Sequence, residues 1–161
     1  PYPRLQQKDW RAQWWSRLPG QHYRLGQQPR TPNRAAARQG IEIGKGDVVI
    51  FHTGWMAMLE IDPKRYMSEQ PGLGKDGAQY LANLGVVLVG ADTRTLEVQP
   101  YADGEIAPVH QILLARNGVY ILEHVRTMNL AADKTYEFLF VMAAAKIEGA
   151  VQGMVHPVAI K

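Results

Sequence analysis

The sequence predicts a soluble α/β domain, and three observations support this class. The chain has 161 residues, of which 46% are hydrophobic, so it is long enough to bury one core. Short runs rich in Val, Ile and Leu are typical of buried strands. Between these runs lie stretches with helical spacing that end at glycine.

The first half of the domain begins with an extended piece and a tight turn over residues 41–47, followed by a central strand over residues 48–53. Residues 62–72 contain Asp62-Pro63 and Pro71-Gly72, which predict a loop. A helix over residues 76–84 ends at Gly85, and a buried strand follows over residues 86–89. Asp92 therefore stands near the carboxyl end of a strand, where ligands bind in open α/β sheets.

In the second half, Pro108 predicts the start of a helix that stops near Asn117-Gly118, and residues 119–122 form the next strand. We expect residues 136–142 and 145–147 to pair as a hairpin. Residues 155–160, interrupted by Pro157, predict an edge strand, because proline cannot donate to a central ladder.

Charge divides the chain near Gly40 into a segment of residues 1–40 and an α/β domain of residues 41–161. Residues 1–40 hold eight basic residues against one acidic residue, whereas the remainder holds ten basic and fourteen acidic residues. The first segment is rich in Trp, Arg, Pro and Gln and has neither strand alternation nor a sustained helical stripe.

Three interpretations of residues 1–40 remain open. Arginine and aromatic residues could bind nucleic acid, but no groove-reading or RNA-binding motif accompanies them, so we do not expect a nucleic-acid partner. Trp10, Trp14 and Trp15 could instead anchor a docking arm in another subunit, with Trp10 and Trp14 on one helix face. The segment could also be an aberrant start joined to a genuine domain.

A glycine motif at residues 72–77 matches the Gly-x-Gly-x-x-Gly spacing of dinucleotide-binding folds. That fingerprint requires a strand leading directly into the first glycine, and residues 66–71 do not form a strand pattern. We therefore expect a glycine-rich turn before a helix at this position.

The absence of cysteine excludes disulfides and thiolate ligands and favours a cytoplasmic location. No apolar run is long enough to span a membrane, so no membrane association is expected. His, Asp and Glu are the remaining candidates for metal ligation.

His110 and Glu123 are the strongest candidates for a functional site. His110 lies on the predicted helix, and Glu123 ends an apolar strand, where a buried carboxylate needs a cation, a proton or a hydrogen-bond donor. The spacing predicts that the two side chains converge, with Asp92 nearby. His52 is a weaker candidate, and we expect structural roles for His124 and His156.

Several short motifs together resemble the putative cyclase family of metal-dependent hydrolases, which includes kynurenine formamidase and isatin hydrolase. The resemblance covers about residues 38–161. It is carried by Gly46-Asp47-Val48-Val49, Thr53-Gly54-Trp55, Pro71-Gly72-Leu73, Gly90-Ala91-Asp92-Thr93, Val109-His110, Leu113-Leu114, Ile121-Leu122-Glu123 and Pro157-Val158-Ala159-Ile160.

The resemblance implies a swivelling β/β/α fold with a mixed, barrel-like sheet, incomplete here, and an assembly of two or more chains that exchange segments. It implies a bound zinc or manganese ion and hydrolysis of a carbon–nitrogen bond, other than a peptide bond, in a small cyclic or formyl amide. His110 and Glu123 match family metal-site positions and are predicted as both metal ligands and catalytic residues. Trp55 and Asp92 are predicted to line or support the substrate site.

One departure from the family matters for function. The family signature His-x-Gly-Thr-His-x-Asp belongs upstream of residue 40, where this chain has only His22 and Asp9. Two ligands would hold a catalytic ion weakly, because catalytic zinc usually takes three protein ligands. We therefore expect a hydrolase that is inactive alone. The alternative is a non-catalytic assembly or binding module that keeps the fold and docks a partner through its basic aromatic arm.

Overall fold

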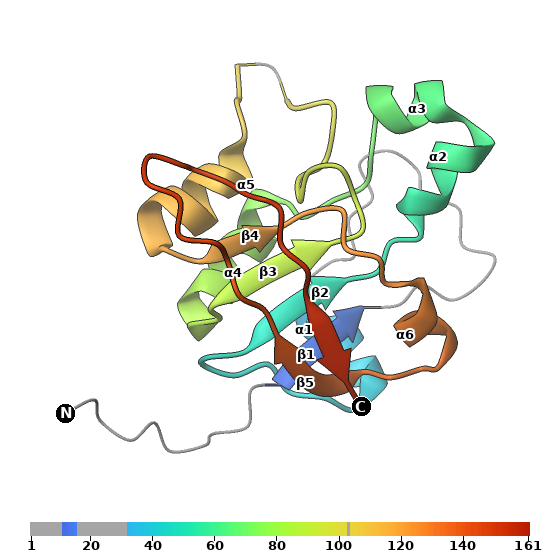
Figure 1. The fold of residues 1–161 in the computed structure, drawn as a ribbon, viewed down its shortest axis with the longest axis vertical. Helices are drawn as coiled ribbons and strands as arrows, with labels where there is room; N and C mark the ends of the chain where they lie inside the picture. Colours follow the sequence, from blue (N-terminus) through green and yellow to red (C-terminus); the bar gives the residue numbers. More distant parts are fainter. Residues whose placement is uncertain (1–10, 16–31, 103) are drawn as a thin grey trace.

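A computed structural model describes residues 11–15, 32–102 and 104–161 of the chain, and in it a six-stranded mixed sheet forms the centre (Figure 1). The strand order is β4-β3-β2-β1-β5-β6. Strands β1 to β4 run parallel, whereas β5 pairs antiparallel with β1 and β6 pairs antiparallel with β5. Because β4 and β6 are both edges, the described strands form an open sheet.

The strands are β1 (Arg11–Trp15), β2 (Val48–Phe51), β3 (Leu88–Ala91), β4 (Tyr120–Leu122), β5 (Glu137–Val141) and β6 (Val158–Ile160). The helices are α1 (Pro32–Gln39), α2 (Met58–Ile61), α3 (Pro63–Ser68), α4 (Lys75–Leu84), α5 (Pro108–His110) and α6 (Met128–Ala132). A single 3-10 turn, η1 (Trp55–Ala57), precedes α2. A wider π-type helix, η2 (Gln111–Arg116), continues α5.

The two faces of the sheet bury separate apolar clusters, as alternation along each strand requires. Val49 and Val89 face a cluster that α1, α4 and η2 complete, with Leu81 and Leu113 fully buried in it. On the opposite face, a second cluster consists of buried Val48, Ile50, Leu88, Leu122 and Phe138, with partly buried residues of α6 and of the chain beyond β5 packed against it. Burial on both faces explains why β2 and β3 are almost continuously apolar.

Helical connections join the parallel strands and bring their carboxyl ends to one edge of the sheet. The chain passes from β2 through α2, α3 and α4 to β3, and from β3 through α5 and η2 to β4 (Figure 1). Three segments therefore start side by side, at His52, Asp92 and Glu123. This edge is the place where open α/β sheets bind ligands.

Most predicted elements of residues 41–161 are present, with shifts at their ends. Helix α4 ends at Gly85, which adopts a left-handed conformation with φ of 78°, and α5 starts at Pro108 as expected. The glycine-rich residues 72–77 follow α3 and an isolated bridge instead of a strand, as expected for a turn.

Four expectations about the fold were wrong. Residues 145–147 form no strand, and β5 pairs with β1 and β6 instead. The loop expected at residues 62–72 begins with α3, because Asp62 caps the helix and Pro63 fits its first position. The described strands do not close into a barrel. The segment expected to lack regular structure contributes β1 and α1, and Trp14 lies in a strand, whereas Trp10 lies outside the described residues.

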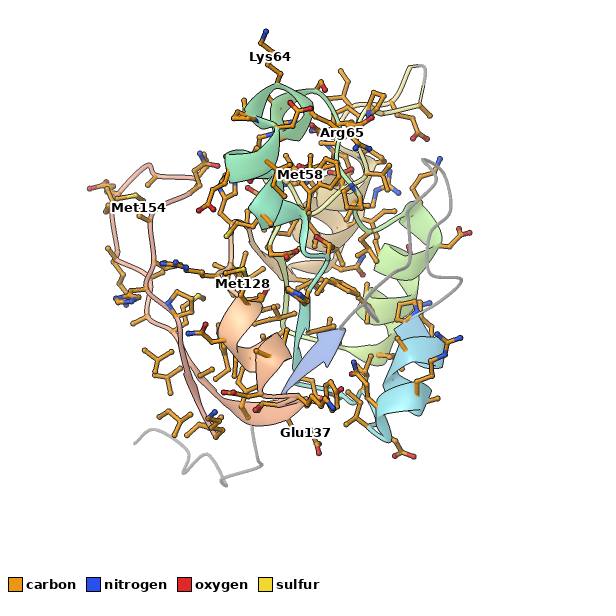
Figure 2. All side chains as sticks on the ribbon, turned by 90° about the vertical axis from the view of Figure 1, so that its right-hand side faces the viewer. Met58, Lys64, Arg65, Met128, Glu137 and Met154 are labelled. Atoms are coloured by element: carbon orange, nitrogen blue, oxygen red, sulfur yellow. The ribbon has the colours of Figure 1, made fainter. Side chains whose placement is uncertain are left out.

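Strands β5 and β6 expose an apolar surface at one end of the sheet. Leu139 pairs directly with Ile160 and Val141 with Val158, and each of these four side chains is about half exposed. The chain between β5 and β6 leaves the sheet as a long excursion, on which Met154 is fully exposed (Figures 1 and 2). None of the described helices has the length and apolar character needed to cross a membrane.

Candidate functional site

The candidate site lies at the carboxyl ends of β2, β3 and β4 and at the start of the α5–η2 helix. These elements carry two groups of interacting side chains. One group surrounds Asp92, and the other surrounds His110.

Asp92 is a buried carboxylate that fixes the turn after β2. Its Oδ1 accepts hydrogen bonds from the backbone N–H of Thr53 at 2.9 Å and from the Thr53 hydroxyl at 2.6 Å. Its Oδ2 accepts from the N–H of Gly54 at 2.8 Å and lies 3.4 Å from Nδ1 of His52. Asp92 thereby positions the start of η1, which carries Trp55. Both oxygens of its carboxylate accept hydrogen bonds from Thr53 or Gly54.

Glu97 is the carboxylate that positions His110. Its side chain is only 1% exposed, and it accepts the backbone N–H groups of Val109 at 2.9 Å and His110 at 3.0 Å. The same carboxylate lies 2.5 Å from Nδ1 of the His110 ring. Negative charge is favoured at this place because the unpaired N–H groups of a helix start point toward it.

Glu123 faces the other nitrogen of the same ring. Its Oε1 lies 3.4 Å from Nε2 of His110, and both side chains are about one-third exposed. Hydrogen bonding and charge from Glu123 and Glu97 raise the pKa of His110 to about 9 against the opposing effect of burial. Burial raises the pKa of Glu97, but hydrogen bonds from His110 and from two backbone amides outweigh it and lower this pKa. His110 is therefore held as a cation between two carboxylates at neutral pH.

Backbone strain borders this pair on both sides. Ala107, just before α5, has φ of 45°, and His124, directly after Glu123, has φ of 54°. Such left-handed conformations are unfavourable for residues other than glycine and persist only where surrounding contacts impose them. At His124 these contacts are a backbone hydrogen bond to the carbonyl of Thr93 and stacking on the ring of Tyr66, at 6.3 Å between centroids.

The donors at His110 and Glu123 suit part of a divalent metal site. Histidine nitrogen and carboxylate oxygen both bind zinc and manganese, and a carboxylate behind the second ring nitrogen is the usual way to orient a metal-binding histidine. However, no group of three His, Asp or Glu side chains that could hold an ion occurs among the described residues. These two donors alone would not complete a metal site.

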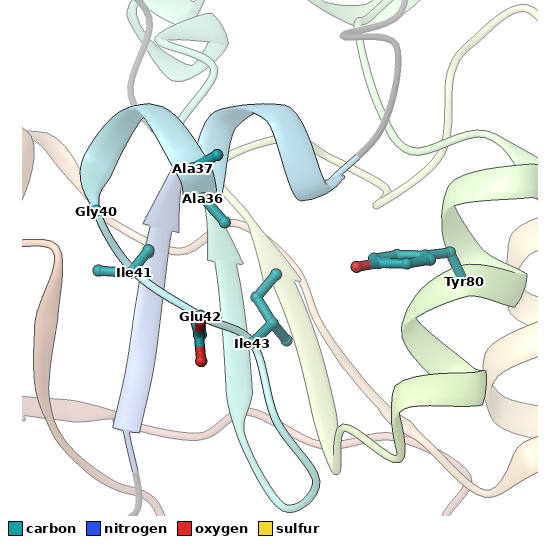
Figure 3. Close-up of a pocket in the computed structure, with 7 residues that line it drawn as sticks. All are labelled: Ala36, Ala37, Gly40, Ile41, Glu42, Ile43 and Tyr80. Carbon is teal, nitrogen blue, oxygen red and sulfur yellow. The ribbon is translucent and has the colours of Figure 1, made fainter.

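A separate hollow of about 510 Å³ lies between α1 and α4 (Figure 3). Its lining is mixed and includes Ile41, Ile43 and the ring of Tyr80 together with Glu42. None of its lining residues belongs to the groups around Asp92 or His110. The chemistry of the candidate site thus lies elsewhere, at the ends of the parallel strands.

The structure brings His110 and Glu123 together, as the sequence predicts, and places Asp92 behind the turn that leads to Trp55. The metal, catalytic and substrate roles predicted for these residues stay predictions. Sequence reasoning missed Glu97. The sequence feature that could have revealed Glu97 is the position of its carboxylate between apolar Leu96 and Val98, because a charged side chain that is buried needs hydrogen-bond or ionic partners.

Comparison with known proteins finds similarity to the same family. The model of the family described as "Putative cyclase" matches residues 26–98. Solved structures with the same fold include one described as a novel cyclase, with 26% identity and a TM-score of 0.75, covering 96% of this chain and 54% of that one. The resemblance to the putative cyclase family is thereby confirmed, and the matched region begins before the expected boundary at residue 38.

Two further structures describe hydrolases. An isatin hydrolase bound to the product analogue thioisatinate is 23% identical, with a TM-score of 0.65, and the match covers 79% of this chain and 49% of that chain; at this identity it supports the fold alone. A structure described as a potential metal-dependent hydrolase with cyclase activity is 25% identical, with a TM-score of 0.50. The match covers 69% of this chain and 49% of that chain. The chain thus spans about half the length of these structures. No curated protein sequence matches it.

Proposed function

We propose that this chain contributes to a metal-dependent hydrolase of the cyclase type, which cleaves a carbon–nitrogen bond in a small cyclic or formyl amide. The observation that carries the proposal is the approach of Nε2 of His110 to Oε1 of Glu123 at 3.4 Å, with Nδ1 held by buried Glu97. The description of one structural neighbour as a potential metal-dependent hydrolase, at 25% identity, supports the reaction type.

The residues of the chain have distinct parts in this proposal. Glu97 accepts from the Nδ1 side of His110, so Nε2 is the atom directed toward Glu123 and the open side of the site. Because its pKa is raised to about 9, His110 carries a proton at neutral pH that Glu123 can share. Cleavage of an amide requires a proton for the departing nitrogen, and protonated His110 would donate it while Nε2 is free of metal. A metal ion bound at Nε2 would displace that proton, so the acid role and the ligand role of His110 exclude each other at any one time.

Asp92 and Trp55 would shape the neighbouring substrate site. Asp92 holds the turn of Thr53 and Gly54, and Trp55 follows it at the start of η1. The guanidinium of Arg65, labelled on α3 in Figure 2, lies 5.5 Å from the centre of the Trp55 ring. A fixed aromatic ring beside the strand ends suits a small aromatic or cyclic amide.

We further propose that the chain alone is inactive, because His110 and Glu123 offer two metal ligands and its sequence lacks the His-x-Gly-Thr-His-x-Asp motif. Either zinc or manganese would suit these donors. The same shortage of ligands favours one alternative, a non-catalytic assembly module. The proposed docking arm of that alternative lies mostly outside the described residues.

We also propose that two copies of the chain associate through β5 and β6. The exposed pairs of Leu139 with Ile160 and of Val141 with Val158 form an apolar surface on an edge of the sheet. Strand β6 leaves one row of backbone groups unpaired among the described strands, and such an edge readily pairs with another strand. A second copy presents the same strand and the same apolar pairs, so the contact is self-complementary.

A complementation assay tests the proposed reaction. The chain, loaded with zinc or manganese, is assayed on isatin and on formanilide, alone and co-expressed with the portion of a cyclase relative that bears the missing motif. We expect no turnover by the chain alone and turnover by the pair, abolished by His110→Ala. Turnover by the chain alone with stoichiometric metal would overturn the inactivity. Failure of the complemented pair, or turnover indifferent to His110→Ala, would argue against the hydrolase.

A further inference from the structure

Three buried hydrogen-bond donors near Asp92 have no acceptor. They are the indole N–H of Trp55, the hydroxyl of Tyr66 and the Nε–H of Arg94. Tyr66 is only 2% exposed. A buried polar group without a partner costs about 1–3 kcal/mol, and native proteins leave few such groups. The fourth unpartnered buried atom among the described residues is an acceptor, Oε1 of Gln39 in α1. The three unpartnered atoms near Asp92 are therefore all hydrogen-bond donors.

Each of the three residues is linked to the segment around Asp92. Trp55 follows the turn that Asp92 holds, and Arg94 stands two residues after Asp92. The hydroxyl of Tyr66 lies close enough to Arg94 and Asp92 for both charges to affect its pKa. Burial raises its pKa, the positive charge of Arg94 opposes this rise, and Asp92 adds to it. The ring of Tyr66 also stacks on His124, the residue directly after Glu123, so the loop adjoins the His110–Glu123 pair.

Arg94 carries a positive charge that no described carboxylate pairs with. Its Nη2 donates to Oε1 of Gln99, which is a neutral amide. The nearby carboxylate of Asp92 accepts hydrogen bonds from Thr53 and Gly54, and it forms no ion pair with Arg94. A partly buried guanidinium is stable when an anion occupies its forked donors, and planar carboxylates match that fork.

We propose that Arg94 and Tyr66, assisted by the indole of Trp55, form a subsite for a carboxylate group of the substrate or product. Binding of an anion follows from the donors alone. The choice of a carboxylate rests on the proposed function, because hydrolysis of an amide leaves a carboxylate. The subsite would adjoin His124, the residue after Glu123, because the ring of Tyr66 stacks on that residue. It makes Arg94 and Tyr66 specificity-determining residues that neither the charge pattern nor the motifs of the sequence revealed.

Direct binding of benzoate, with benzamide as its uncharged counterpart, tests the subsite without metal or turnover. Titration calorimetry and backbone NMR shifts are measured on the wild type, Arg94→Gln, Tyr66→Phe and Arg116→Gln. Arg116 is exposed on η2 and serves as the charge-matched control. A lost charged hydrogen bond is worth roughly 1.5–3 kcal/mol, so Arg94→Gln should weaken benzoate binding about tenfold or more. Tyr66→Phe should weaken it several-fold, and Arg116→Gln should leave it unchanged.

Three results would overturn the subsite: no benzoate binding to the wild type, equal binding of benzamide, or benzoate affinity that survives Arg94→Gln. Circular dichroism of each variant verifies that the fold is kept, and Arg94→Lys provides a second variant that retains the charge while losing the fork. The result of the benzoate test is independent of the result of the complementation assay for the hydrolase. Arg94-dependent benzoate binding with no turnover in the complementation assay keeps the subsite and rejects the reaction. Turnover without benzoate binding does the reverse.

Discussion

The protonation of His110 should stabilise the fold in a pH-dependent way. Its pKa rises from 6.5 to about 9 through Glu123 and Glu97, and this difference corresponds to roughly 3 kcal/mol. The side chain is 30% exposed, so solvent screening lowers the expected contribution to about 2 kcal/mol. Because the folded-state pKa is raised, this stability is complete below pH 6.5 and is lost as the pH rises through about 9.

The perturbation is His110→Gln, with the matched control His156→Gln at an exposed position. Urea unfolding at pH values from 6 to 10 gives the free energy of unfolding of each protein, and NMR of the imidazole Cε1–H signal follows the titration of His110. We expect the wild type to exceed His110→Gln by about 2 kcal/mol at pH 6 and this difference to shrink toward pH 10. The control should show no such trend. An imidazole midpoint near 6.5, or a difference independent of pH, would refute the reasoning.

Four further substitutions test other parts of the structure. Asp92→Asn replaces one acceptor oxygen by an amide N–H donor, which leaves either the Gly54 N–H or Thr53 without its acceptor. Urea unfolding should show that the free energy of unfolding falls by about 2–4 kcal/mol, against less than about 1 kcal/mol for exposed Asp76→Asn. Equal losses in the two variants would contradict the role of Asp92. Gly72→Ala places a Cβ 2.2 Å from the carbonyl carbon of Glu97 and 2.6 Å from the carbonyl oxygen of Leu96, which should cost about 3 kcal/mol or more. Gly153→Ala meets nothing within 4 Å and should be nearly neutral in the same urea unfolding measurement, so a neutral Gly72→Ala would show that the close packing is absent. Leu139→Lys and Ile160→Lys should convert a dimer to a monomer in light scattering, whereas Ile147→Lys, exposed away from the sheet, should not; a monomeric wild type would remove the proposed association.

The sequence predicted the parallel strands β2, β3 and β4 well because local signals agree there, whereas it did not predict β1. Val48, Val49 and Ile50 form a β-branched run buried on both faces, and Gly85 and Pro108 mark a helix end and a helix start by their backbone preferences. The same signals were misleading at residues 145–147, where a short apolar run lies in the excursion and finds no partner strand. Pairing depends on the rest of the sheet, and no local pattern specifies it.

Part of the candidate site was predictable for the same reason. Glu123 follows an apolar strand and His110 lies on a helix that starts at proline, so their approach could be inferred from the order of the elements. The contact of Glu97 with His110 depends on how the loop after β3 folds back onto the helix start, and turn residues alone do not fix that path. The orphaned donors of Tyr66 and Arg94 likewise exist only after packing has removed water from them.

The proposed hydrolase requires that His110 and Glu123 together bind a divalent metal ion at the open side of the site. Titration calorimetry with zinc chloride and manganese chloride, on the wild type, His110→Ala and Glu123→Ala, measures this directly. We predict weak binding of a divalent ion to the wild type, with release of the His110 proton and therefore stronger binding as the pH rises toward 9. Both variants should lose this binding, whereas the control Glu105→Ala should retain it. Absence of binding, or binding that survives both substitutions, would contradict the central claim.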